Sequence, residues 1–187
     1  MNFSDTSRDE ALRETLIDGK TIHKGRIVHL QEWEARLPNG KTAGREIVRH
    51  VGAAAVAAVD EEGRILLVRQ YRAPINDMLW EIPAGKLDAK DEPTLAAAQR
   101  ELEEETGYVA KNWTLLTDMI TTPGFCDEHI GLYLATDLVK TQTHPDEDEF
   151  LISVWAPLDE AIAAIATGEI RDAKTIAALL LAKEALK

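Results

Sequence analysis

Hydrophobic and polar positions along residues 92–106 repeat with the spacing of a helix. Apolar or small side chains recur every three or four positions, which places them on one face of a helix. These side chains are Leu95, Ala98, Leu102 and Thr106. Gly107 follows directly and suits the left-handed residue that commonly ends a helix. We therefore predict a helix over residues 92–106 that packs on this face.

Short apolar runs bounded by turn residues predict strands and hairpins elsewhere. One hairpin is expected to join residues 21–37 to 41–50 through Pro38-Asn39-Gly40, because Asn-Gly is a strong hairpin signal. A second hairpin is expected over residues 53–59 and 64–71. The remaining elements are strands at 79–83, 113–120, 129–135 and 150–155, and helices at 4–17, 158–166 and 173–186. Strands and helices alternate without a regular βαβ rhythm, which indicates an α/β fold with a mixed sheet and helices packed on it.

Residues 1–50 differ in character from the rest of the chain. They offer one short amphipathic helix and a hairpin, and few apolar positions from which to build a core. We therefore predict two parts, an appendage at 1–50 and a catalytic or binding domain at 51–187. The appendage is expected to dock on a second subunit and to act as a dimerisation element.

Charge and composition narrow the classes of partner. The 187 residues carry a formal net charge of −12, so the surface repels phosphate backbones and anionic membranes. Nucleic acid and membrane are therefore not expected as partners. The first residues lack a basic segment followed by an apolar core, which argues against a signal peptide. The single cysteine, Cys126, fits a reducing compartment, and we expect a cytoplasmic protein that acts on a small molecule.

The segment RELEEETG at residues 100–107 carries the candidate chemistry. On a helix, Glu101, Glu104 and Glu105 project into one quadrant. Like charges this close destabilise a helix by about a few tenths of a kcal/mol per pair, so a cation would offset the repulsion. Magnesium prefers carboxylate oxygen atoms, and two-metal phosphoryl-transfer sites are built from carboxylates. The alternative is a charged face that simply meets solvent.

The surrounding spacing resembles the Nudix box, which is a glycine, a glutamate and then REUxEExGU, where U is aliphatic. Gly85 and Glu92 precede Arg100 in this order, and Gly107 ends the motif. Two positions depart from the pattern. Six residues separate the glycine from the glutamate instead of five, and Tyr108 replaces an aliphatic residue. The extra residue lies in the loop before the helix and removes no carboxylate.

Further segments look like the ADP-ribose pyrophosphatase branch of this family. They are VRQYR at 68–72, WEIPAG at 80–85, TPGF at 122–125 and DAKTIA at 172–177, and Pro123 lies 15 positions beyond Tyr108. The resemblance implies an α/β/α sandwich, Mg²⁺ as cofactor with Mn²⁺ as a substitute, and hydrolysis of ADP-ribose to AMP and ribose 5-phosphate by a dimer. The alternatives are another nucleotide sugar such as GDP-mannose, a dinucleotide, or a regulator that binds ADP-ribose without cleaving it.

The resemblance also assigns roles to particular residues. The metal ligands would be the carbonyl oxygen of Ala84 and the carboxylates of Glu101, Glu104 and Glu105. A general base would come from Glu147 or Glu149. Substrate contacts would come from Arg45 and Arg72 to the diphosphate, from Glu46, Glu81 and Glu128 to ribose or adenine, and from Trp33 by stacking on adenine. For Trp33, a place in the core or an interface is the competing interpretation. Each arginine could instead be a surface residue or serve only to pair strands.

Overall fold

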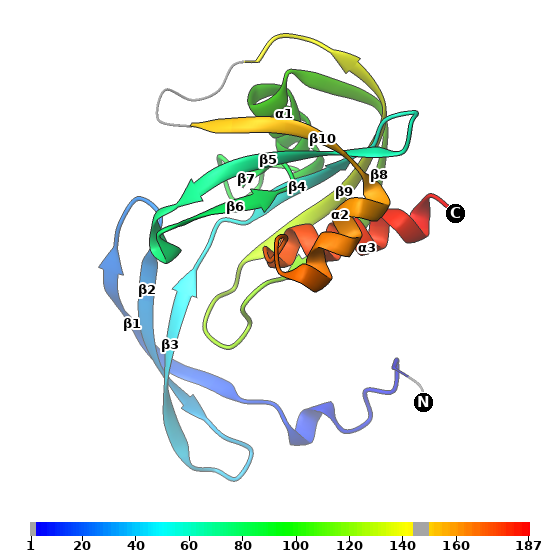
Figure 1. The fold of residues 1–187 in the computed structure, drawn as a ribbon. Helices are drawn as coiled ribbons and strands as arrows, with labels where there is room; N and C mark the ends of the chain where they lie inside the picture. Colours follow the sequence, from blue (N-terminus) through cyan, green and yellow to red (C-terminus); the bar gives the residue numbers. More distant parts are fainter. Residues whose placement is uncertain (1–2, 144–149) are drawn as a thin grey trace. The chain divides into compact units, whose positions relative to one another are not determined.

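The computed structural model describes residues 3–143 and 150–187 and divides the chain into two compact units (Figure 1). The first unit comprises Met1–His50 with Thr122–Glu128, and the second comprises Val51–Thr121 with His129–Lys187.

Two sheets form the second unit. The larger sheet has the order β7 (Ala84–Lys86), β4 (Ala53–Ala58), β9 (His129–Lys140) and β8 (Tyr108–Ile120). Strands β4 and β9 are parallel, whereas the other two pairs are antiparallel, so the sheet is mixed. The smaller, antiparallel sheet has the order β10 (Leu151–Pro157), β5 (Arg64–Arg72) and β6 (Asp77–Glu81), with a short 3₁₀ turn at Ala73–Ile75 between β5 and β6.

Strand β4 lies at the centre of the core, and all six of its residues are buried. Its even-numbered residues pack in one cluster with Leu102 of helix α1 (Thr94–Thr106). Its odd-numbered residues pack in a second cluster that includes residues of α2 (Leu158–Thr167) and α3 (Ala173–Ala185). Figure 1 shows these helices on opposite sides of β4. The predicted α/β/α sandwich is therefore confirmed.

Helix α1 forms close to the predicted range. It starts at Thr94 because Pro93, which precedes it, has extended backbone angles and serves as the N-cap residue. It ends at Gly107, whose φ of 68° is strained for residues with a side chain, and whose N–H donates to the carbonyl of Glu103. The α1 residues Ala98 and Leu102 are fully buried, as the helical spacing predicts, whereas Leu95 of the same predicted face is 36% exposed.

The first unit is a three-stranded antiparallel sheet of β1 (Thr15–Lys24), β2 (His29–Arg36) and β3 (Thr42–Arg49), preceded by a 3₁₀ turn at Asp9–Ala11. Among the described residues of this unit, only Ala35 is buried. Strand β1 is exposed along its whole length, and two register shifts leave Ile17 and Ile22 outside its pairing with β2. This sheet is held mainly by its backbone ladder, not by a core.

Two sequence predictions are wrong. The helix at 4–17 is replaced by the 3₁₀ turn and the start of β1, because the backbone of Thr15 and Leu16 pairs with β2 and an isolated short helix is unstable. The hairpin over 53–71 does not form either, since β4 and β5 belong to different sheets. They share only the bridge between Val59 and Ile65 beside the turn. A strand as apolar as β4 is stabilised more by a central position, with neighbours on both edges.

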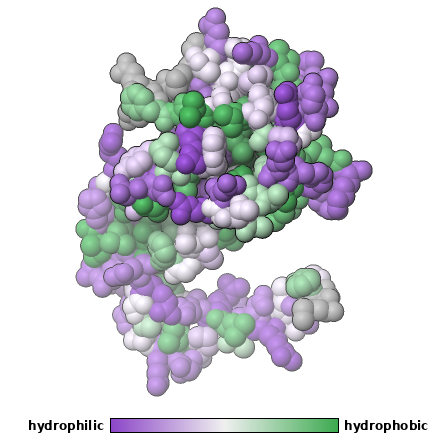
Figure 2. All heavy atoms as spheres, in the orientation of Figure 1, coloured by the Kyte–Doolittle hydropathy of each residue, from purple (hydrophilic) through white to green (hydrophobic). Residues whose placement is uncertain are grey.

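Hydrophobic side chains also reach the surface among hydrophilic ones (Figure 2). In the first unit they include Ile22 and Ile27, which are 52% and 60% exposed, and in the second Ile152, which is 61% exposed. Within the described residues, every helix is too short or too polar to cross a membrane.

Candidate active site

The three predicted metal-binding glutamates lie together on α1, close to β7. Glu101 and Glu105 are only 8% and 4% exposed, whereas the Glu104 side chain is 37% exposed. Gly85 of β7 approaches Glu101 so closely that an added Cβ would lie 2.0 Å from the carboxylate carbon. Only glycine leaves room for this carboxylate, which explains the glycine of the motif in steric terms. Ala84, whose carbonyl is the predicted fourth ligand, precedes this glycine in β7.

Arg100 forms hydrogen bonds with two of these three carboxylates. Its Nη1 donates to Glu101 at 2.6 Å and to Glu104 at 3.4 Å, and its Nη2 donates to the carbonyl of Lys86 at 3.2 Å. Burial lowers the pKa of Arg100, but the charges of Glu101 and other nearby carboxylates outweigh burial and raise the pKa above its usual value. The guanidinium is thus a permanent cation that orients two of the three carboxylates.

Glu92 steadies the loop between β7 and α1. Its carboxylate accepts a hydrogen bond from the N–H of Asp88 at 2.6 Å and lies 3.6 Å from Arg100. The loop that holds the extra residue of the motif is therefore tied to the same arginine as the helix carboxylates.

The donor set suits a hard divalent cation, since it offers carboxylate oxygens on a helix and a backbone carbonyl on the adjacent strand. As the side chains lie, no group of three His, Cys, Asp or Glu residues in the part of the chain described is arranged to hold a metal ion. Two of the three carboxylates point to Arg100 instead. The residues therefore fit a metal by chemical type, and Arg100 competes with it for Glu101 and Glu104.

Arg72 and Glu81 form a bidentate ion pair in the same unit. Arg72 Nε and Nη2 each donate to one oxygen of the Glu81 carboxylate at 2.7 Å. Glu81 is 1% exposed, whereas the Arg72 side chain is 39% exposed. The hydrogen bond with Glu81 raises the pKa of Arg72 despite burial, and the charge of Glu105 adds to the rise. Of the three α1 carboxylates, Glu105 is thus the one that acts on the Arg72 charge.

The first turn of α3 completes this ion pair. Lys174 donates to Glu81 and, at 3.0 Å, to Asp172. Asp172 caps α3 by accepting from the N–H of Thr175 at 3.0 Å and from its hydroxyl at 2.7 Å. The buried hydroxyl of Thr175 accepts in turn from the N–H of Ile82, at 3.0 Å. Sequence reasoning did not give Lys174 a role, although the DAKT segment with its capping aspartate was a usable signal.

Burial alone would raise the pKa of Glu81, yet Arg72 and Lys174 outweigh burial and lower it. The carboxylate is therefore charged and fully engaged by two cations. Glu81 was predicted to contact ribose or adenine. Its geometry is that of a group that holds Arg72.

The other predicted substrate contacts lie in the first unit. The indole of Trp33 lies over Gly19, where an added Cβ would be 2.3 Å from the ring, and its Nε1 donates to Gln31 at 2.9 Å. The guanidinium of Arg49 lies 5.9 Å from the centre of the Trp33 ring. The tryptophan is half-buried on the sheet.

Arg45 is already engaged within this unit. Its Nε and Nη2 donate to Glu14 at 2.9 and 2.6 Å, and its Nη1 donates to the carbonyl of Gly44. Glu46 is exposed on β3, opposite Glu32 of β2. Glu128 lies 3.4 Å from the ring of His50. Glu147 and Glu149 lie outside the described residues.

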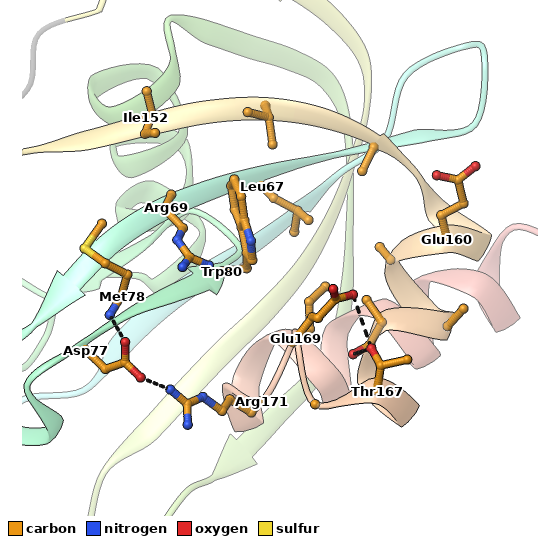
Figure 3. A pocket seen from close by; sticks show the side chains of 17 residues that line it. Leu67, Arg69, Asp77, Met78, Trp80, Ile152, Glu160, Thr167, Glu169 and Arg171 are labelled. Carbon is orange, nitrogen blue, oxygen red and sulfur yellow. Dashed lines mark hydrogen bonds and ion pairs between the residues drawn. The ribbon is translucent and has the colours of Figure 1, made fainter.

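A pocket of about 1010 Å³ opens on another part of the second unit, between the smaller sheet and α2 (Figure 3). Arg69 stacks on Trp80, 4.9 Å from the ring centre, and Asp77 pairs with Arg171 at the rim. None of the predicted site residues within 3–143 and 150–187 lines this pocket. Trp80 thus lines this pocket, whereas the candidate metal ligands lie on α1 and the candidate diphosphate contact is Arg72.

Comparison with known proteins agrees with the sequence motif and the fold. The NUDIX domain model matches residues 48–179. ADP-ribose pyrophosphatase of Bacillus subtilis is 43% identical over 182 residues, which cover 95% of this chain and 98% of that protein. Methanol dehydrogenase activator of Bacillus methanolicus is 46% identical over 178 residues, or 93% of this chain and 96% of that protein. The crystal structure of an ADP compounds hydrolase matches with a TM-score of 0.81 and 25% identity, covering 93% of this chain and 94% of that one. With the glutamates of RELEEETG in register on α1, the chain belongs to the NUDIX domain family.

Proposed function

We propose that this protein hydrolyses the diphosphate bond of ADP-ribose to give AMP and ribose 5-phosphate, with Mg²⁺ as cofactor and Mn²⁺ as a substitute. The observation that carries the proposal is the group of three carboxylates on α1 beside Gly85. The B. subtilis relative named ADP-ribose pyrophosphatase, similar over nearly its whole length, supports this choice of substrate.

In this proposal, each candidate site residue has a distinct role in hydrolysis. Glu101, Glu104, Glu105 and the carbonyl of Ala84 would hold the metal, which would supply Lewis-acid neutralisation of the diphosphate charge. Arg72 binds a diphosphate oxygen through the part of its guanidinium that Glu81 does not use. Glu147 or Glu149 accepts a proton from the attacking water. The new bond joins the water oxygen to phosphorus, the bridging P–O bond breaks, and the two monophosphates leave.

In this proposal, the first unit joins two copies of the chain in a dimer. A three-stranded sheet with one buried residue among those described gains stability by covering its exposed apolar side chains, and a second copy of the chain is the partner we propose. Trp33 would then stack on adenine. The acidic charge and the single cysteine support a cytoplasmic location without nucleic acid or membrane as partners.

A substrate panel tests the proposal. Purified protein with Mg²⁺ is incubated with ADP-ribose, NAD, GDP-mannose, FAD or a diadenosine polyphosphate, and the products are identified. We expect AMP and ribose 5-phosphate from ADP-ribose at a higher kcat/KM than any other substrate gives. Faster cleavage of another panel member would keep the chemistry and replace the substrate. Binding of ADP-ribose without cleavage would favour the regulator.

A pair of variants on α1 controls this experiment. Glu105→Gln removes a proposed metal ligand without changing its size, and we expect kcat/KM to fall by at least about 100-fold. Glu103→Gln removes an equal charge from the same helix, away from the carboxylate group, and should leave kcat/KM within about twofold of wild type. Equal activity of the two variants would contradict the proposed site.

A second candidate function is activation of a dehydrogenase, because the B. methanolicus relative of that name is 46% identical over nearly its full length. The test is the rate of a methanol dehydrogenase with and without the protein. Activation that persists in Glu105→Gln would separate this function from hydrolysis.

A further inference from the structure

We propose that Lys174 of α3 is a positioning residue that fixes Arg72 for the diphosphate, acting through Glu81. This inference rests on the proposed function, because it assigns Arg72 a phosphate oxygen as its ligand. It adds an element that the sequence motif does not contain, since Lys174 lies 93 positions beyond Glu81.

The inference starts from the geometry of Arg72. Glu81 uses Nε and Nη2 of the guanidinium, and no described residue forms a hydrogen bond with Nη1. A bidentate pair fixes the plane of a guanidinium as well as its position. The direction of the remaining N–H groups of Arg72 is therefore set by the orientation of the Glu81 carboxylate.

The orientation of Glu81 is set in turn by α3. Lys174 donates to Oε2 of Glu81, the oxygen that also accepts from Arg72 Nη2. The N–H of the next residue, Ile82, donates to Thr175 on the same turn of α3. Glu81 is thus held at its carboxylate and at its backbone by two neighbouring residues of one helix. Asp172 fixes both of these residues by accepting from each of them.

Burial explains why a second cation is needed. Glu81 is 1% exposed, and a buried carboxylate that loses a partner keeps the cost of its desolvation. An anionic ligand near Arg72 competes with Glu81 for the guanidinium. Lys174, which is 13% exposed, keeps Glu81 in an ion pair when Arg72 donates some of its hydrogen bonds to the ligand. Without Lys174, Arg72 would be the only cation paired with Glu81. Glu81 would then compete more strongly with the phosphate for the Arg72 guanidinium.

If Lys174 only joined α3 to β6, its substitution would lower the stability of the fold and leave ligand binding unchanged. The two roles differ in ligand binding at temperatures where every variant is folded. The probe is ADP-ribose, whose dissociation constant is measured by calorimetry in EDTA, so that metal binding does not enter the result. The KM and kcat with Mg²⁺ are measured alongside, together with the melting temperature.

Three variants make the comparison. Lys174→Met removes the charge and keeps the length of the side chain, Lys174→Arg keeps a cation, and Lys183→Met is the matched control on the same helix, where the lysine pairs with exposed Asp159. We expect Lys174→Met to raise the dissociation constant and KM by about tenfold with a smaller change in kcat. Lys174→Arg should recover most of this loss, and Lys183→Met should match wild type. If Lys174→Met does not fold, Lys174→Gln takes its place, with the same expected direction.

The outcomes are distinct. A lower melting temperature of Lys174→Met with an unchanged dissociation constant would overturn the inference and leave the proposed function intact. Equal losses in Lys174→Met and Lys183→Met would also overturn it, because the effect would then belong to the helix in general. If wild type neither binds nor cleaves ADP-ribose, the proposed function fails, and with it the premise of the inference.

Discussion

The two units of this protein represent two ways of holding strands together. In the second unit, β4 is buried on both faces, and the clusters on its two sides contain residues from all three helices. In the first unit, three strands of similar length bury only Ala35 among the described residues. Both units thus have paired strands, but their cores are very unequal. The comparison teaches that the extent of strand pairing does not indicate how much hydrophobic core lies behind a sheet.

The largest expected difference between the two units comes from adding one methyl group to a glycine in each. In Gly85→Ala, the new Cβ would meet the Glu101 carboxylate at 2.0 Å, so either the strand or the carboxylate must move. We expect kcat/KM for ADP-ribose to fall by about 100-fold, because displacements of about 1 Å in a site have effects of this size. Gly44→Ala in β3 meets nothing within 4 Å and should retain activity. Equal activities would show that Glu101 does not need its observed position.

Arginine substitutions decide which unit supplies the cation for the diphosphate. Arg72 has one terminal nitrogen outside its ion pair, whereas all three guanidinium nitrogens of Arg45 are engaged by Glu14 and Gly44. We therefore expect Arg72→Lys to lower kcat/KM by about 10- to 30-fold, since lysine lacks the bidentate fork. Arg45→Lys should have a smaller effect. A larger loss in Arg45→Lys would move the diphosphate contact to the first unit.

The exposed side chains of β1 test whether the first unit joins two subunits. Ile17 and Ile22 are 45% and 52% exposed and lie at the two register shifts. Introducing aspartate at both positions should weaken a dimer formed through this unit by about tenfold or more, because charges in an apolar interface are unfavourable. Analytical ultracentrifugation measures the change. Leu180→Asp on α3, at 51% exposed, is the control, and an equal effect there would exclude the first unit as the specific interface.

The smallest expected effect concerns the dependence of stability on pH. In the folded protein, the pKa of Glu81 lies below its ordinary value of 4.5, because the two cations outweigh burial. The unfolded chain therefore binds more protons in this range, so the stabilisation is complete above about pH 4.5 and is lost as the pH falls through the lowered pKa. We expect the melting temperature of wild type to fall more steeply than that of Glu81→Gln below pH 4.5. Parallel curves would show that Glu81 is not the group responsible.

The sequence predicts the parts of this molecule that depend on neighbouring residues. Helix α1, its end at Gly107 and the common face of Glu101, Glu104 and Glu105 all follow from helical spacing and local conformation. The helix expected at 4–17 fails locally, where β1 pairs with the next strand, whereas the other error concerns pairing over distance. Residues 53–59 and 64–71 have the pattern of a hairpin, but β4 finds its parallel partner in β9, more than 70 positions later.

The site shows the same limit. RELEEETG identifies the carboxylates, but nothing near Glu81 indicates that its charge is satisfied by Arg72 on a neighbouring strand and Lys174 on the last helix. That Glu81 contacts ribose or adenine stays a prediction. Local sequence shows which chemical groups are present, whereas burial and pairing, which assign each group to binding or to support, come from the tertiary structure.

The attachment of α3 to β6 has a consequence for how the protein is made. The glutamates of the motif and Arg72 leave the ribosome long before Asp172 and Lys174 do. A nascent chain that has reached residue 150 holds every proposed metal ligand, but Glu81 lacks one of its cations and the backbone N–H beyond it lacks its acceptor. Under the proposal that Lys174 positions Arg72 through Glu81, this support forms only after the first turn of α3 has been synthesised and has docked, late in translation.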